Sequence, residues 1–245
     1  MLRRLWSASG LPAKVTACLF NDRTLMNPLT ILNDSLYFFR RNLGALLALC
    51  LPLVVVEALA KQAVSSAIAN NTSSGFELLI GLLFYPLYTG ALILFLDARS
   101  RGDHPAGRDL LAMALRMWPT FAVLSALSTL LIMFGLSLFI APGIWVMVKL
   151  VFAEYFLVLR GMTPLMAMRA SFELSKGHFV RILTCVLCIY IPLSLLEGGA
   201  YYLASEPPNA AVTLTINVVS SFLQLFTSVV MYRLFMLITE PGKRE

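Results

Sequence analysis

Long apolar runs separated by short polar segments dominate the pattern of this chain. Six of these runs approach the roughly 20 residues that cross the hydrocarbon core of a bilayer as a helix. They are residues 43–60, 78–96, 121–140, 144–159, 182–203 and 212–238. No segment shows the alternation of apolar and polar residues that is typical of a strand. We therefore predict an all-α membrane protein with six transmembrane helices.

Composition agrees with this pattern and bounds the domain organisation. Hydrophobic residues make up 59% of the 245 residues, and charged residues make up 13%. Soluble domains carry roughly 25% charged residues. Because no loop is long enough for a soluble domain, we predict one membrane domain over residues 27–240. A cytoplasmic segment at 1–26 precedes it, and a cytoplasmic tail at 241–245 follows it.

The lysine and arginine residues predict how the helices are oriented. In a six-pass arrangement all but two of the 19 basic residues fall on one side, and the exceptions are Lys61 and Lys149. Loops rich in these residues stay on the cytoplasmic side, so both termini are predicted to be cytoplasmic. The resulting basic face has two interpretations. It reflects topology alone, or its side chains also contact anionic lipid headgroups. The candidates for headgroup contact are Arg40, Arg41, Arg169, Lys176 and Arg181.

A short amphipathic segment at residues 163–179 is predicted to form a helix that lies at the membrane surface. Thr163 suits the N-cap, Pro164 the first helical position and Gly177 the C-terminal cap. One face of the helix would carry Leu165, Met168 and Phe172, and another face would carry Arg169, Glu173 and Lys176. Such a helix is too short to span and is suited to the interface.

This segment has counterparts elsewhere in the chain. Residues 27–43 align with residues 163–179 without gaps, and residues 105–118 repeat the pattern more weakly. The alignment predicts three interfacial amphipathic helices and three repeats of one such helix plus a helical hairpin, related by an axis along the membrane normal. The repeat units are residues 27–97, 104–160 and 163–239. The alternative is convergence on a common amphipathic pattern.

Two charges interrupt the fourth apolar run, which reads APGIWVMVKLVFAEYF over residues 141–156. Lys149 and Glu154 lie about 140° apart around a helix, so they are not predicted to pair with each other. Residues 141–143 are predicted to form a tight outer turn. In one interpretation Lys149 extends to the outer interface, and Glu154 reaches the inner interface or a basic partner on another segment. In the other, a charge faces the bundle interior or a wet cavity.

A narrow polar stripe runs along the sixth apolar run. Its members fall within about 80° of one another at 100° per residue, and they are Thr213, Asn217, Ser220, Gln224 and Thr227. Such a stripe either holds helices together by side-chain hydrogen bonds or lines a polar crevice. Together with Lys149 and Glu154, these residues form the candidate intramembrane polar site.

No arrangement of residues indicates an enzyme. His104 and His178 have no set of cysteines or carboxylates at metal-ligand spacing beside them. Cys185 and Cys188 form a CxxC pair inside an apolar span, where small packing residues are expected rather than a redox motif. We therefore expect no catalytic residues, no cofactor and no metal. Nucleic acid is not an expected partner, because the basic residues alternate with membrane spans.

Several segments carry a family resemblance: Pro142-Gly143-Ile144, KLVFA at 149–153, residues 163–179 and YRLFMLI at 232–238. Together they resemble the YciC family of bacterial inner-membrane proteins. They are also similar to the integral-membrane domain fused to some glycerophosphodiester phosphodiesterases. The resemblance implies a Gram-negative inner membrane and no catalytic activity, because the phosphodiesterase part has no counterpart here. The chain departs from the pattern at Glu154, where related sequences often have proline.

These observations lead to two expectations about function. The first is a non-enzymatic multi-pass inner-membrane protein in envelope or membrane-lipid homeostasis, acting as a lipid-handling or partner-scaffolding bundle. Its expected partners are membrane lipids and an envelope lipid-transport assembly or another membrane protein. The alternative is a small-solute transporter or channel whose polar crevice is lined by the sixth helix.

Overall fold

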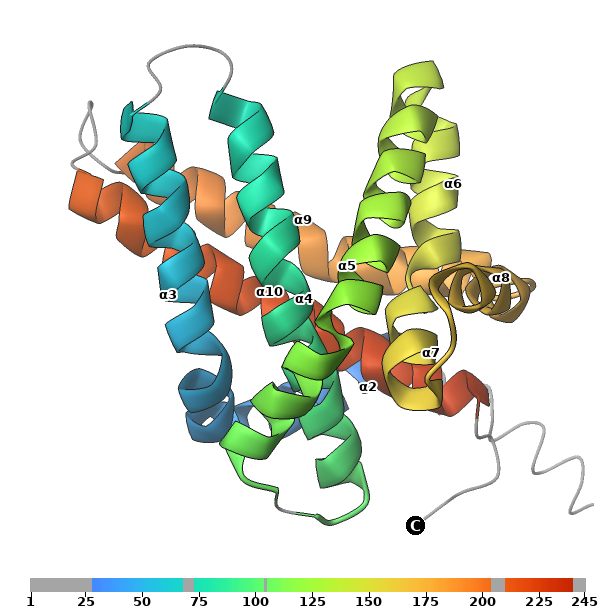
Figure 1. Cartoon of the computed structure of the whole chain (residues 1–245). Helices are drawn as coiled ribbons and strands as arrows, with labels where there is room; N and C mark the ends of the chain where they lie inside the picture. Colours follow the sequence, from blue (N-terminus) through green and yellow to red (C-terminus); the bar gives the residue numbers. More distant parts are fainter. Residues whose placement is uncertain (1–27, 68–72, 104, 204–209, 240–245) are drawn as a thin grey trace, which may run out of the picture.

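The computed structural model describes residues 28–67, 73–103, 105–203 and 210–239. This part of the chain is helical and contains no strand (Figure 1). The helices are α2 (Pro28–Arg41), α3 (Leu43–Ala67), α4 (Ser73–Ser100), α5 (Gly107–Leu138), α6 (Ile140–Leu150), α7 (Ala153–Arg160), α8 (Pro164–Leu174), α9 (Phe179–Leu203) and α10 (Ala210–Thr239). The prediction of an all-α chain is confirmed. The predicted segment at 1–26, the tail at 241–245 and His104 lie outside the described residues.

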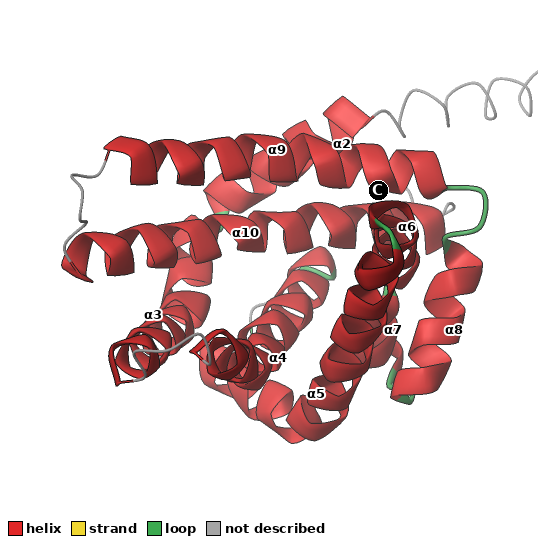
Figure 2. Ribbon diagram, turned by 90° about the horizontal axis from the view of Figure 1, so that it is seen from above, coloured by secondary structure: helices red, strands yellow, loops and turns green. Residues whose placement is uncertain are grey.

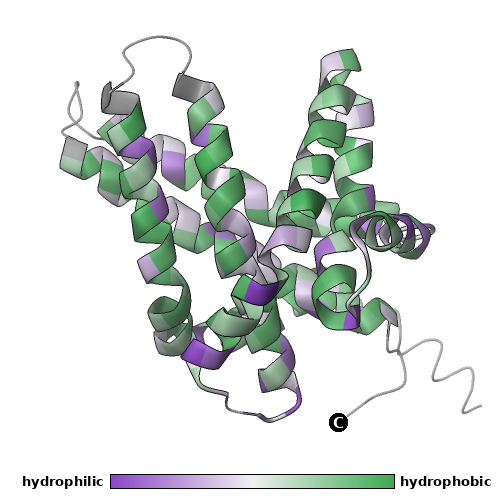
Figure 3. Ribbon diagram, viewed as in Figure 1, coloured by the Kyte–Doolittle hydropathy of each residue, from purple (hydrophilic) through white to green (hydrophobic). Residues whose placement is uncertain are grey.

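Six stretches of the described chain are long and apolar enough to cross a membrane, as predicted. They are Leu43–Val64, Gly75–Ser100, Gly107–Leu138, Ile140–Arg160, Phe179–Leu203 and Ala211–Thr239. Figure 3 shows apolar residues along the long helices, with hydrophilic residues gathered near the turn between α4 and α5 and along α8. Large apolar side chains such as Leu130, Phe134 and Leu195 are 66%, 66% and 71% exposed. Outward apolar surface of this extent suits contact with lipid.

The long helices form hairpins, but their axes are not all aligned. In Figure 1, α3 and α4 make one antiparallel hairpin, and α5 with α6 and α7 makes a second. The start of α3, the turn between α4 and α5, and the end of α7 lie toward the same end of these hairpins. α9 and α10 pair with each other and cross the other four spans at a steep angle (Figure 2). The chain is therefore not a bundle of six parallel axes.

The middle of the three predicted interfacial stretches does not form a helix of its own. Most of residues 105–118 belongs to α5, a single helix of 32 residues with Pro119 inside it. Proline is tolerated within a membrane helix where other groups satisfy the freed backbone, so it does not end this helix. The first and third stretches do form separate short helices, α2 and α8.

The tight turn predicted at residues 141–143 lies two residues earlier in the structure. α5 ends at Leu138, and Phe139 is extended, with φ −160° and ψ 157°. Pro142 and Gly143 therefore belong to the opening of α6. A proline suits this position because the first N–H groups of a helix have no intrahelical partner to lose.

Two glycines let the backbones of α5 and α6 touch. A Cβ atom on Gly143 would lie 2.4 Å from Leu136 Cδ2 and 2.9 Å from the Leu136 backbone nitrogen. A Cβ atom on Gly135 would lie 3.0 Å from the Gly143 Cα. Carbon atoms in contact are normally about 3.5–4.0 Å apart. Glycine is therefore required at position 143 for this close packing, and a Cβ atom at position 135 would make an unusually tight contact.

The fourth span is interrupted at Val151 and Phe152, and α8 satisfies the backbone there. The Ser171 hydroxyl donates to the Lys149 carbonyl oxygen at 2.6 Å and accepts from the Phe152 N–H at 3.2 Å. The Ser175 hydroxyl lies 3.4 Å from the same carbonyl oxygen. Backbone groups at membrane depth need partners within the protein. These hydrogen bonds therefore permit a break between α6 and α7.

α8 buries only part of the predicted apolar face, together with small side chains beside it. Ala167, Ser171 and Ser175 are fully buried, and α8 packs on α7. Of the predicted apolar face, Met168 is buried, Phe172 is half-buried and Leu165 is 62% exposed. Small side chains allow α8 to approach the broken span closely, and hydrophobic periodicity alone does not reveal that requirement.

Gly143→Ala is expected to force α5 and α6 apart and to destabilise the chain by about 1–3 kcal/mol, the range for overpacking. The midpoint of thermal unfolding, measured for the purified chain in nanodiscs, should fall. Gly44→Ala is the matched control, because Gly44 is also helical and a Cβ atom there would meet nothing within 4 Å. An unchanged midpoint for Gly143→Ala would show that the two backbones do not touch.

Ser171→Ala should leave the Phe152 N–H without a partner and weaken the bonding of the Lys149 carbonyl. The expected cost is about 1–3 kcal/mol for buried unsatisfied groups, read as a lower unfolding midpoint in nanodiscs. Ser137→Ala is the control, because the Ser137 hydroxyl also bonds a helical carbonyl, that of Phe134, but is exposed. Equal midpoints for the two variants would contradict the role given to Ser171.

Candidate functional site

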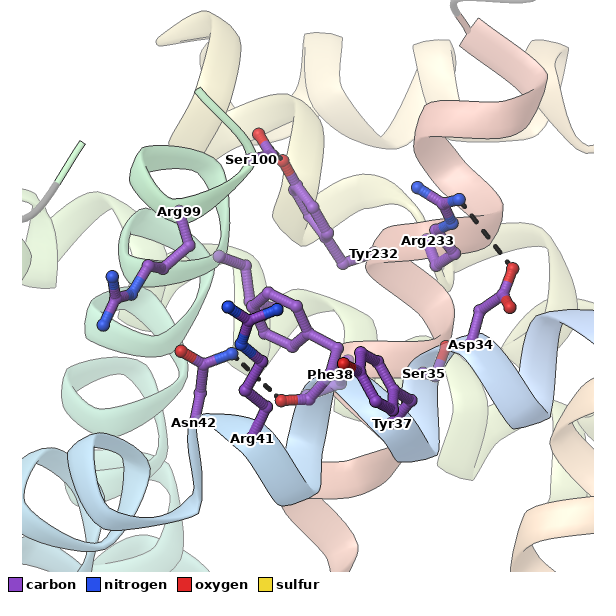
Figure 4. A pocket seen from close by; sticks show the side chains of 12 residues that line it. Asp34, Ser35, Tyr37, Phe38, Arg41, Asn42, Arg99, Ser100, Tyr232 and Arg233 are labelled. Atoms are coloured by element: carbon purple, nitrogen blue, oxygen red, sulfur yellow. Dashed lines mark hydrogen bonds and ion pairs between the residues drawn. The ribbon is translucent and has the colours of Figure 1, made fainter. Parts of the chain in front are cut away.

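A pocket of about 580 Å³ lies between α2, the end of α4 and α10 (Figure 4). Its charged and aromatic polar lining consists of Asp34, Tyr37, Arg41, Arg99, Tyr232 and Arg233. Three arginines against one aspartate give it a net positive charge. We refer to it as the basic pocket.

The arginines of the basic pocket are held from three different helices. Arg41 and Arg99 lie in the last turns of α2 and α4, where a cation interacts favourably with the helix dipole. The Arg99 guanidinium lies 5.6 Å from the centre of the Phe95 ring. Arg233 Nη2 is 3.9 Å from Asp34 Oδ2, and an ion pair this exposed contributes little to stability. Figure 4 shows Arg41 and Arg99 on one side of the pocket and Arg233 with Asp34 on the other.

Among the five residues predicted to contact headgroups, Arg41 lines the basic pocket. The others are exposed or half-buried elsewhere: Arg40, Arg169, Lys176 and Arg181. The sequence placed Arg99 and Arg233 on the basic side of the chain without marking them as a site. Their meeting depends on α10 crossing the end of α4, and charge counting contains no information about that crossing.

A second cavity, of about 540 Å³, lies between the two hairpins and reaches α9 and α10. We call it the polar cleft. Its charged lining residues are Glu57, Lys61, Glu77 and Glu154. Four tyrosines and five serine or threonine side chains of the described chain also line it. A cavity this polar is unusual within apolar spans, where buried polar groups are costly.

Glu154 is the carboxylate that the fourth span contributes to the polar cleft. It is half-buried in the first turn of α7, directly after the break in the fourth span. Oε1 and Oε2 accept from the Tyr85 hydroxyl of α4 at 2.8 and 3.1 Å. The observed partner is thus a neutral hydroxyl, not the basic side chain that the sequence suggested. Tyr85 was missed because a single tyrosine in an apolar run produces no pattern.

Some of the other polar groups of the cleft have ion-pair or hydrogen-bond partners, and some have none within the described part of the chain. Lys61 Nζ lies 2.6 Å from Glu57 Oε1, so these two charges pair within α3. Tyr88 lines the cleft beside them. Ser125 Oγ and Thr227 Oγ1 are buried and have no hydrogen-bond partner among the described residues. These two hydroxyls therefore have unused hydrogen-bonding capacity.

Lys149 does not line the polar cleft with Glu154. Its side chain is 8% exposed, and Nζ lies 5.9 Å from the centre of the Trp145 ring one helical turn earlier. The stem therefore runs back along α6, in the predicted outward direction, but it stays covered. The Trp145 ring in turn packs edge-on against Phe172 of α8, with ring centres 5.8 Å apart.

The predicted polar stripe of the sixth span, now α10, is only partly inside the protein. Thr227 lines the polar cleft, while Thr213 and Ser220 are half-buried outside it. Asn217 is exposed, and its Oδ1 accepts from the Tyr201 hydroxyl at 2.6 Å. Gln224 is exposed. The stripe is thus split between a contact to α9 and a single residue of the cleft.

The chain is similar to bacterial proteins whose printed name is UPF0259 membrane protein. Examples are those of Yersinia pestis (strain Pestoides F) and Yersinia pseudotuberculosis serotype O:3 (strain YPIII), each 26% identical over 163 residues. The match covers 66% of this chain and 62% of the length of these relatives. No family model and no solved structure matches the chain. The relatives and the six apolar helices together support a multi-pass membrane protein, and the resemblance to YciC stays a prediction.

Gln224→Leu is expected to leave the unfolding midpoint unchanged, because the side chain is exposed and no described residue bonds it. Asn217→Leu should lower the midpoint, because it removes the hydrogen bond from Tyr201, which is worth about 0.5–1.5 kcal/mol. Thermal unfolding in nanodiscs measures both. A large loss for Gln224→Leu would mean that this face is covered in the assembled protein.

Proposed function

We propose that this chain is a non-enzymatic multi-pass protein of a bacterial inner membrane that binds anionic phospholipid headgroups and acts in membrane-lipid homeostasis. The observation that carries the proposal is the basic pocket, with Arg41, Arg99 and Arg233 around one cavity of about 580 Å³. Basic pockets between helices on the cytoplasmic side of a membrane are suited to anionic headgroups.

The chemistry of the basic pocket fits a phosphate group. Arginine offers several donors in a planar fork that matches the oxygens of a phosphate. Tyr37 is 68% exposed at the same pocket, and Tyr232 is buried in its wall. Tyrosine is favoured at the level of lipid headgroups, because its ring is apolar and its hydroxyl is wet. A phosphate bound by the arginines would thus have an amphipathic rim around it.

We further propose that α2 and α8 lie at the interface of the cytoplasmic leaflet. The exposed apolar side chains of the two helices are Leu36, Tyr37, Leu165 and Met166. The basic pocket and the turn between α4 and α5 lie toward the same end of the α3–α4 hairpin, which supports a cytoplasmic orientation of that end.

The burial of α2 and α8 supports the proposed repeat. Ile31, Ser35 and Phe39 are buried in α2. They align with Ala167 and Ser171 of α8 and with its C-cap Ser175, which are all fully buried. If one unit had been duplicated, the two short helices would be expected to bury the same aligned positions, each ahead of a helical hairpin. The second unit, at 104–160, differs because its amphipathic segment continues into α5.

A second candidate function is a small-solute transporter or channel. The observation that favours it is Glu154 in the polar cleft beside a broken span. Discontinuous helices and intramembrane carboxylates are features of transport sites. For the lipid-handling function, the partner class we propose is an envelope lipid-transport assembly or another membrane protein.

The test of the first proposal is lipid analysis by mass spectrometry of the chain extracted into native nanodiscs. We expect enrichment of anionic phospholipid over the bulk membrane. Each arginine near a headgroup contributes about 1 kcal/mol, so Arg41→Gln with Arg233→Gln should reduce the preference roughly tenfold or more.

The matched control is Arg40→Gln with Arg169→Gln, which removes the same charge from exposed residues outside the pocket. It should preserve the enrichment. A bulk-like lipid profile of the unaltered chain would contradict the proposal. Equal losses in the two double variants would assign the effect to the general basic face rather than to the pocket.

A further inference from the structure

We propose that the polar cleft binds a ligand that carries a primary ammonium group, supplied by a soluble amine or by the amine headgroup of a phospholipid. The cleft is separate from the basic pocket, so this proposal does not rest on the lipid-handling function. It stands on the charge of the cleft, on hydroxyl groups without partners, and on the size and aromatic lining of the cavity.

The polar cleft carries more negative than positive charge. The ammonium group of Lys61 pairs with Glu57 and offsets it. Glu77 and Glu154 are half-buried, and no lysine or arginine nitrogen of the described chain lies within 4.0 Å of either carboxylate. A carboxylate within a span is costly unless it is paired. A cationic ligand would supply the partner.

Glu154 keeps the capacity to accept hydrogen bonds from such a ligand. Both of its oxygens are bonded by one donor, the Tyr85 hydroxyl. A carboxylate has about four acceptor positions, and an ammonium group has three N–H donors. Glu154 can therefore bind an ammonium group without losing Tyr85.

Two unsatisfied hydroxyls point independently to a ligand. The Ser125 side chain is only 6% exposed, it lines the cleft, and its Oγ has no partner among the described residues. Thr227 of α10 lines the same cleft, and its Oγ1 is also buried without a hydrogen-bond partner among the described residues. Buried polar groups without partners are rare and costly. A hydroxyl oxygen can accept an N–H of an ammonium group, so each of these two side chains offers an acceptor that the described residues leave unused.

The size and walls of the cleft favour an organic cation over a metal ion. Its volume of about 540 Å³ lies within the range of small-molecule sites, about 300–1,000 Å³. Tyr85, Tyr88, Tyr155 and Tyr190 line it, and tyrosine rings attract cations to their faces. The described residues contain no group of three histidine, cysteine or carboxylate side chains able to hold a metal.

The first arm of the test uses ethanolamine and the full chain in nanodiscs of phosphatidylglycerol, a lipid without an amine. A ligand that binds the folded state raises the unfolding midpoint, and sodium chloride at equal ionic strength provides the baseline. We expect ethanolamine to raise the midpoint. Glu154→Gln should weaken its binding by about tenfold or more, as for a lost hydrogen bond to a charged group.

The second arm replaces part of the phosphatidylglycerol with phosphatidylethanolamine and omits ethanolamine. A higher midpoint in this arm alone, absent from Glu154→Gln, identifies the lipid headgroup as the source of the amine. A response to ethanolamine alone identifies a soluble amine. Both results support the ammonium site, and they separate its two sources.

Glu173→Gln is the matched control, because Glu173 is exposed on α8 and pairs with Lys176 outside the cleft. It should leave the amine response unchanged. If Glu154→Gln fails to fold, Ser125→Ala takes its place, because it removes a hydroxyl that has no partner and should weaken amine binding about two- to tenfold.

The ammonium site is overturned by no response in either arm, or by equal responses in the unaltered chain and the cleft variant. A response to sodium that ethanolamine does not exceed also overturns it. The arginine variants of the basic pocket are measured in the same nanodiscs and should keep the amine response. The test of the polar cleft and the test of the basic pocket are therefore independent, and failure of one proposal does not decide the other.

Discussion

The hydrogen bonds of Ser171 supply backbone partners at the break in the fourth span. A break inside a bilayer exposes backbone groups where no water can bond them. Ser171 supplies one donor and one acceptor there, so the break requires α8 to stay docked on α7. The break in turn begins α7 at Ala153 and places Glu154 in its first turn, facing Tyr85. The buried Ser171 hydroxyl of α8 thus stabilises the break that positions Glu154 in the polar cleft.

The number of long helices could be predicted because a bilayer sets a minimum length for each apolar run. Their exact ends could not, since polar residues such as Glu77 and Arg99 continue α4 beyond the apolar run at both ends. Proline positions were also ambiguous. Pro119 lies inside α5 and Pro142 lies near the start of α6, and only the surrounding contacts distinguish these uses.

The polar site could be predicted in part. Glu154 and Thr227 stand out as polar residues in apolar runs, and both line one cleft. Lys149 stands out equally, but its side chain packs toward Trp145. This could not be predicted, because periodicity assigns a residue to a face of its helix without saying which other helix covers that face. Tyr85 and Ser125 complete the cleft, yet each is one ordinary residue of an apolar run. Their role follows from how α4, α5 and α7 meet, which depends on the whole fold.

The glycine contact between α5 and α6 has a mechanical consequence. With their backbones touching at Gly135 and Gly143, the two helices move as one plate, since closely packed elements resist relative displacement. One wall of the polar cleft, including Ser125, Ile132 and Met147, belongs to this plate. The other walls belong to α3, α4, α7, α9 and α10. A change in the width of the cleft therefore requires this plate to move as a whole, or one of the other helices to move.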